Sequence, residues 1–95
     1  MQTRRNELDF KGQNIYVGFD VHLKSWKVTI MTEKLTHKTF SQPPKPEVLY
    51  QYLAKNFPGG IYHSAYEANF CGYWIHNSLK EFGVNSIVVN PADNQ

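Results

Sequence analysis

The chain is 95 residues long, enough for one domain or part of one, and its 41% hydrophobic and 15% aromatic content excludes a wholly disordered chain. Its single cysteine, Cys71, excludes an internal disulfide and a cysteine-based zinc cluster. The N-terminus lacks the apolar core of a signal peptide and no run is long enough to cross a bilayer, so a soluble, intracellular protein without a membrane partner is expected.

The net charge of +2 does not by itself define a partner. Lysines gather in the first two thirds of the chain, where they fit either a polyanionic partner or an ordinary solvated surface. They are Lys24, Lys27, Lys34, Lys38, Lys45 and Lys55.

The first half of the chain predicts an arm and three strands. Residues 1–13 are polar and charged, which predicts a flexible N-terminal arm. Residues 15–20 can be buried on both faces, as in a central strand. Residues 25–32 alternate between apolar and polar side chains, and residues 35–41 form a third, more polar strand. The short polar links between these segments favour antiparallel hairpins.

The second half predicts an alternation of helices and strands. Pro46 suits a first helical turn, and Pro58 with two following glycines ends that helix. A strand covers residues 61–67, and a second helix then ends at Gly83, which suits a left-handed C-terminal cap. Residues 85–90 hold a buried fifth strand. One face of the second helix is expected to be apolar: Cys71, Trp74, Ile75, Ser78, Leu79 and Phe82.

Two hairpins followed by right-handed crossovers predict an α/β fold with a mixed sheet in the order 3-2-1-4-5. This is the arrangement of ribonuclease H-like domains. In it the first and fourth strands are parallel neighbours, so Asp20 and Glu67 meet at the same edge of the sheet. Gly18 and Ala65, two positions earlier, are small and leave space beside the carboxylates. Paired carboxylates are hard oxygen ligands, so Asp20 and Glu67 predict a site for Mg²⁺ or Mn²⁺.

Several segments resemble the DEDD transposases of bacterial insertion sequences, specifically the insertion-sequence 110 family, which includes the pilin-gene invertases. The resemblance covers residues 15–91, and its specificity lies in the order and spacing of short motifs. These are YVGFDVH at residues 16–22 with Lys24, YEA at 66–68, GY at 72–73, LKEFGV at 79–84 and VVNP at 88–91.

The resemblance implies a RuvC-like nuclease domain in which four acids, Asp, Glu, Asp and Asp, bind divalent metal. Asp20 matches the first acid and Glu67 the second. In the family, the third and fourth acids follow the fifth strand in a helical segment, and a second domain carries a serine nucleophile. The helical segment with these two acids and the second domain would both lie beyond Gln95. Asp93, in the loop after the fifth strand, is not assigned as the third acid.

Residues 14–95 are therefore expected to be a partial RuvC-like catalytic domain, truncated after the fifth strand. The resemblance implies metal-dependent DNA cleavage and strand transfer by the full-length protein, with the fragment alone inactive. It also implies DNA as partner, a guide RNA encoded by the element, and a bacterial cytoplasmic, nucleoid-associated location. Exposed apolar surface left by the truncation predicts a homo-oligomer.

Each candidate residue also has a structural interpretation. Asp20 could cap the turn into the hairpin, and Glu67 could be a surface acid near the start of the second helix. His22 and His63 are interpreted as a hairpin cap and a satisfied buried histidine. Tyr62 and Tyr66 could stack on bases but are more often packing residues.

Two other functions stay open. Sugar kinases and actin-like ATPases share the ribonuclease H-like sheet and begin with a strand that ends in Asp. Their phosphate-binding hairpin is rich in glycine, whereas residues 21–25, VHLKS, contain none, which argues against ATP binding. A non-catalytic nucleic-acid-binding or assembly module of the same fold is the third hypothesis.

Overall fold

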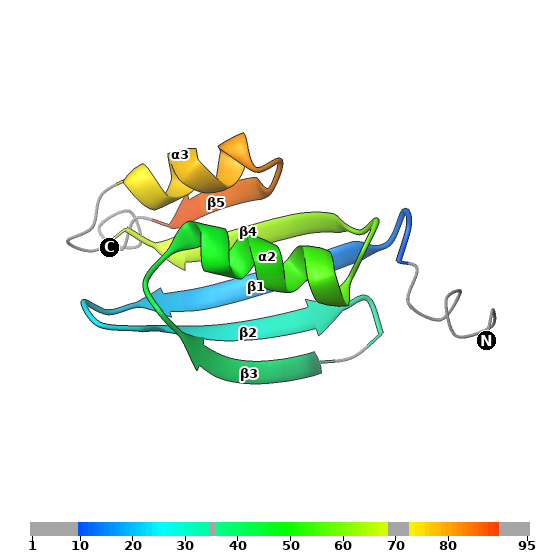
Figure 1. The fold of residues 1–95 in the computed structure, drawn as a ribbon, viewed down its shortest axis with the longest axis horizontal. Helices are drawn as coiled ribbons and strands as arrows, with labels where there is room; N and C mark the ends of the chain where they lie inside the picture. The colour runs from blue at the N-terminus through cyan, green and yellow to red at the C-terminus, as the bar shows by residue number, and fades with distance from the viewer. Residues whose placement is uncertain (1–9, 35, 69–72, 90–95) are drawn as a thin grey trace.

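The computed structural model describes residues 10–34, 36–68 and 73–89. Within them the chain forms one five-stranded sheet and two helices (Figure 1). In chain order these are β1 (Asn14–Val21), β2 (Trp26–Thr32), β3 (Thr36–Gln42), α2 (Pro46–Asn56), β4 (Ile61–Glu67), α3 (Trp74–Glu81) and β5 (Asn85–Val89). Among these described elements, no helix has the length and apolar character needed to cross a membrane.

The strand order is β3-β2-β1-β4-β5, which confirms the predicted order. β1 pairs antiparallel with β2, and β2 antiparallel with β3. β4 pairs in parallel with β1 on one side and with β5 on the other. The central strand β1 and its neighbour β4 therefore run in the same direction and end at the same edge of the sheet.

Both helices cover one face of the sheet, so the molecule has two layers (Figure 1). The alternation of side chains along β1 shows the difference between the faces: Ile15, Val17 and Phe19 are buried under the helices, whereas Tyr16 and Asp20 are exposed on the opposite side. Each large apolar side chain buried in this way contributes about 1.5–3 kcal/mol. We call the side without helices the open face.

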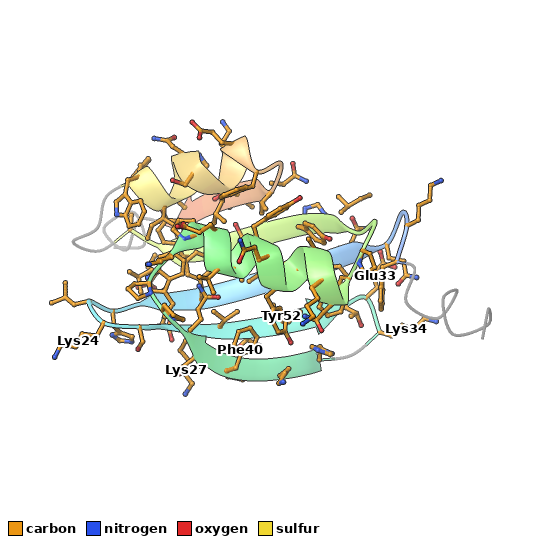
Figure 2. All side chains as sticks on the ribbon, in the orientation of Figure 1. Lys24, Lys27, Glu33, Lys34, Phe40 and Tyr52 are labelled. Atoms are coloured by element: carbon orange, nitrogen blue, oxygen red, sulfur yellow. The ribbon has the colours of Figure 1, made fainter. Side chains whose placement is uncertain are left out.

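Helix α2 is attached to the sheet through Tyr62 on β4. Leu49 and Leu53 of α2 are fully buried against the sheet. The Tyr62 hydroxyl lies 2.6 Å from the Phe57 carbonyl oxygen and 3.1 Å from that of Leu53, at the C-terminal end of the helix. Burial raises the pKa of Tyr62. At the outer side of the sheet, Phe40 of β3 packs on Tyr52 of α2, with ring centroids 4.5 Å apart (Figure 2).

Strand β5 and helix α3 correct two sequence expectations. The fifth strand is expected to be buried, but Ile87 on this outer strand is 63% exposed. The second helix is expected to bury its whole apolar face. Ile75 and Leu79 are fully buried as predicted, but Trp74, expected in the core, is 50% exposed, and Phe82, expected on the same face, is 39% exposed. The described part of α3 has eight residues and lies over the outer strand β5 (Figure 1). Only a narrow stripe of apolar side chains on this helix therefore packs against the sheet. Trp74 is one residue from Ile75, about 100° around the helix, and falls outside that stripe. Cys71, expected on the same face, lies outside the described residues.

Gly83 forms the predicted left-handed cap of α3. Its φ angle is 92°, and the Gly83 and Val84 amides donate to the carbonyls of Lys80 and Leu79 at 2.9 and 3.0 Å. This pair of bonds is the Schellman pattern, which satisfies carbonyls left free at the helix end. The tight cap lets the chain enter β5 two residues later.

The arm predicted for residues 1–13 is described from Phe10 onward, and this portion is attached to the fold. The Phe10 amide donates to the Pro58 carbonyl at 2.9 Å, and its ring meets that of Phe57 edge-on, with centroids 5.1 Å apart. Gln13 continues the attachment, because its carbonyl accepts from the Ile61 amide at 2.7 Å. Residues 1–9 of the predicted arm lie outside the described residues.

Candidate functional site

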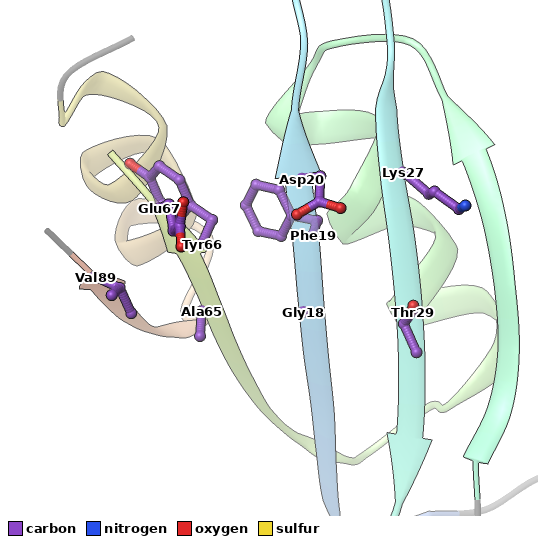
Figure 3. Close-up of a pocket in the computed structure, with 9 residues that line it drawn as sticks. All are labelled: Gly18, Phe19, Asp20, Lys27, Thr29, Ala65, Tyr66, Glu67 and Val89. Carbon is purple, nitrogen blue, oxygen red and sulfur yellow. The ribbon is translucent and has the colours of Figure 1, made fainter. Parts of the chain in front are cut away.

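Asp20 and Glu67 lie on adjacent parallel strands, as predicted. The register pairs Gly18 with Ala65 and Phe19 with Tyr66, so the next step along both strands brings Asp20 beside Glu67. Both side chains are on the open face and are exposed to solvent (Figure 3). That they bind one cation together stays a prediction.

The two carboxylates line a pocket of about 450 Å³ on the open face (Figure 3). Small residues create its space: a Cβ built on Gly18 would meet no atom within 4 Å, and Ala65 stands beside it in the register. The prediction that these residues leave room next to the acids is therefore confirmed. The described lining residues are Gly18, Phe19, Asp20, Lys27, Thr29, Ala65, Tyr66, Glu67 and Val89.

Stacked aromatic rings support the two acidic strands from the helix side. The Phe19 ring stacks on both Trp26 and Tyr66, with centroids 4.9 Å apart in each pair. The Tyr66 hydroxyl accepts a hydrogen bond from the His76 amide of α3 at 3.0 Å. The backbone positions from which Asp20 and Glu67 project are therefore held by packing between neighbouring strands and by a helix, which favours a preorganised site.

The side of the pocket formed by β2 carries a cation and a hydroxyl. Lys27 pairs with Asp20 in the register, and Thr29 pairs with Gly18. Figure 3 shows the Lys27 ammonium directed away from the Asp20 carboxylate. Lys27 belongs to the alternating pattern of residues 25–32, but the pattern alone does not indicate that it lies at the site. The signal that could have found it is the hairpin register, which sets the residue opposite Asp20.

The described residues provide part of a metal-binding ligand set. Asp20 and Glu67 offer hard carboxylate oxygens, and the pocket beside them has room for a hydrated ion. Within residues 10–34, 36–68 and 73–89, no group of three or more His, Cys, Asp or Glu side chains is arranged to hold a metal. The acids thus fit a divalent cation as two of its ligands, and further ligands have to come from elsewhere. Asp93 lies outside the described residues.

The two candidate histidines have structural partners. The His22 backbone amide donates to the Ser25 carbonyl at 3.1 Å and closes the β1–β2 hairpin, while its side chain is exposed, so its role as a hairpin cap stays a prediction. His63 is on the Glu67 face as expected, half-buried, with its Nε2 2.8 Å from the Asn14 side-chain oxygen. His63 also stacks on Tyr16, with centroids 5.2 Å apart. These contacts are toward the start of β1, away from the acidic edge.

At that same far end, Asn14 donates its backbone and side-chain N–H groups to Glu33 at 3.2 and 2.8 Å. These two hydrogen bonds lower the pKa of the Glu33 carboxyl. Glu33 and Lys34 lie at the end of the sheet opposite Lys24 and Lys27 (Figure 2).

Tyr62 and Tyr66 are buried under the helices, which supports their interpretation as packing residues.

In comparisons with known proteins, the chain matches no protein-family model, and no curated protein is similar enough to be counted as a relative.

Alanine substitutions at two glycines test the space in the pocket. We expect Gly18→Ala to keep or raise the stability by up to about 1 kcal/mol, because its Cβ enters open space and the unfolded chain loses freedom. Gly60→Ala is the matched control: its Cβ would lie 3.0 Å from the buried Ile15 side chain and 3.2 Å from the Phe57 carbonyl oxygen. Such overpacking costs about 1–3 kcal/mol. Urea unfolding measures both, and a Gly18→Ala loss as large as that of Gly60→Ala would contradict an open pocket.

Proposed function

We propose that Asp20 and Glu67 are the first two metal ligands of a ribonuclease H-like, RuvC-like nuclease domain. We further propose that the chain is the N-terminal part of a DEDD transposase similar to the insertion-sequence 110 family. The observation that carries the proposal is the placement of both acids on one face and one edge of adjacent parallel strands, in a single pocket. In this function the whole protein would cut and join DNA strands in the bacterial cytoplasm, with a guide RNA as partner.

The fold supports the ribonuclease H-like assignment in its order of elements. Three antiparallel strands are followed by helix, strand, helix and strand, and the sheet order is β3-β2-β1-β4-β5. The acids stand on the two strands where the resemblance expects them. The topology supports the same class of protein as the motifs, and the two acids within the motifs have the metal-binding chemistry that this class requires.

The roles of the residues follow from their positions. Asp20 and Glu67 would hold the divalent cation from two neighbouring strands, and Gly18 and Ala65 would keep the floor beneath it clear. A cation bound there would polarise a phosphoryl oxygen and lower the pKa of a bound water. The open face is free of helices (Figure 1), so within the described fold a DNA backbone can approach the acids directly.

A non-catalytic nucleic-acid-binding module is a second candidate function. The observation that favours it is that the described residues bring together two acidic ligands rather than a complete set. No feature of the described structure favours the remaining hypothesis, an ATP-binding domain of the sugar-kinase or actin-like kind. Four apolar side chains exposed on the open face, Tyr16, Met31, Ile61 and Ile87, support self-association in either case.

Metal binding is tested by thermal unfolding with and without Mn²⁺. A ligand at ten times its dissociation constant stabilises the fold by about 1.4 kcal/mol, which corresponds to a rise in Tm of roughly 6–11 °C for a domain of this size. We expect Asp20→Asn to abolish this rise, because it removes a charged ligand. Glu81→Gln, an equal loss of charge on the exposed surface of α3, should keep it. An Asp20→Asn protein that responds to Mn²⁺ like the parent would place the metal elsewhere.

The isolated chain is expected not to cut DNA. Two-metal phosphoryl transfer needs cations at both the attacking and the leaving oxygen, about 3.5–4 Å apart, and two carboxylates cannot fix both. Incubating residues 1–95 with supercoiled plasmid and Mg²⁺ or Mn²⁺ should give no more nicking than Asp20→Ala does. Robust cleavage by the parent that Asp20→Ala abolishes would show that the chain is a complete catalyst, and would contradict this prediction while supporting the site.

A further inference from the structure

We propose that the open face beside the acids contains a phosphate-binding subsite for a nucleic-acid strand, with Lys27 as its cation and the hydroxyls of Thr29, Thr39 and Ser41 around it. The assignment of the strand as the substrate rests on the proposed function. The subsite itself rests on the geometry of β1, β2 and β3.

The register places these residues in two rows across the open face. One row runs from Ser41 on β3 through Lys27 on β2 to Asp20 on β1, and then to Glu67 on β4. The second row, two residues away along the strands, runs from Thr39 through Thr29 to Gly18 and Ala65. Neighbouring strands are about 4.8 Å apart. Lys27 and Thr29 are therefore one strand away from Asp20, and Thr39 and Ser41 are two strands away.

Lys27 is available to a ligand. Its side chain is exposed, and its ammonium is directed away from Asp20 (Figure 3). It is the one cationic side chain among the described residues that line the pocket. A strand whose reacting phosphate is near the two carboxylates needs a positive charge to offset their repulsion, and Lys27 supplies that charge from the adjacent strand.

The threonine hydroxyls add hydrogen-bond donors. The Oγ1 atoms of Thr29 and Thr39 are 3.1 Å apart, so one hydroxyl donates to the other. The hydroxyl that accepts this bond retains its own proton for a ligand oxygen. Lysine and hydroxyl side chains are frequent phosphate contacts in protein–DNA complexes, where they set the position of the backbone without reading sequence. The subsite therefore positions a strand across β2 toward the acids.

The experiment measures binding of a fluorescein-labelled single-stranded oligonucleotide to residues 1–95 in EDTA, by anisotropy over a range of salt concentrations. Each phosphate neutralised in a single strand contributes about 0.7 to the slope of log K against log salt. We expect Lys27→Gln to reduce the slope by about 0.7 and to weaken binding. Lys38→Gln is the control, because Lys38 pairs with the buried Ile30 and so lies on the helix-covered face of the same sheet. Lys38→Gln removes the same positive charge as Lys27→Gln and should bind the oligonucleotide as tightly as the parent protein does.

Equal effects of the two substitutions, or no binding by the parent, would overturn the subsite. Thr29→Val provides a second variant that removes a hydroxyl without changing the charge, and weaker binding is expected from it as well. Competition with inorganic phosphate at constant ionic strength distinguishes a site for a nucleic-acid backbone from a site for free phosphate. Lys27-dependent stabilisation of the fold by inorganic phosphate, without oligonucleotide binding, would overturn the nucleic-acid assignment.

The proposed phosphate subsite and the proposed metal site can be tested independently of each other. Lys27→Gln should keep the Mn²⁺-dependent rise in Tm, since it removes no metal ligand. Asp20→Asn should lose that rise but bind the oligonucleotide in EDTA at least as tightly as the parent, because a negative charge facing the strand is removed. Loss of oligonucleotide binding in Asp20→Asn would contradict a subsite centred on Lys27.

Discussion

The parallel pairing of β1 with β4 is the constraint on which the rest of the structure depends. It joins the N-terminal hairpins to the helical second half of the chain, and it brings Asp20 and Glu67 to the same edge. Burial of Ile15 and Val17 beneath the helices stabilises this pairing, and the stack of Phe19 on Tyr66 links the two strands just before the acids. A one-residue slip in register would turn one acid toward the core.

The second constraint is that both described helices cover the same face of the sheet (Figure 1). Polar and small residues on the other face, such as Gly18, Lys27 and Thr29, are therefore accessible at the centre of the sheet instead of being covered. Central strands are normally the best supported part of a fold, so chemistry placed there has a rigid base. The same arrangement leaves Ile87 63% exposed on the outer strand, which makes this face suited to contact with a further surface.

Much of this could be predicted from local patterns. Alternation in β2, the prolines and glycines around α2, and Gly83 after α3 determine the elements, and the handedness of crossovers determines their order. The expectation that β1 is buried on both faces is wrong, because Tyr16 and Asp20 are exposed on the open face. The exposure of Trp74 could not be predicted, because the apolar pattern of a short helix does not show how much of it lies over the sheet. Lys27 was missed because its position opposite Asp20 depends on the register of a hairpin. The contact of Phe10 with Phe57 joins residues far apart in the chain, and no local pattern indicates it.

The central claim is that Asp20 and Glu67 together bind a divalent cation on the open face. Paramagnetic broadening of amide signals by Mn²⁺, recorded by NMR on residues 1–95, tests it most directly because it locates the ion. We expect selective broadening of the amide signals of Gly18, Asp20, Ala65 and Glu67, and the loss of this broadening in Asp20→Asn. Broadening centred instead on His63 and His76, or spread evenly over the surface acids, would contradict it.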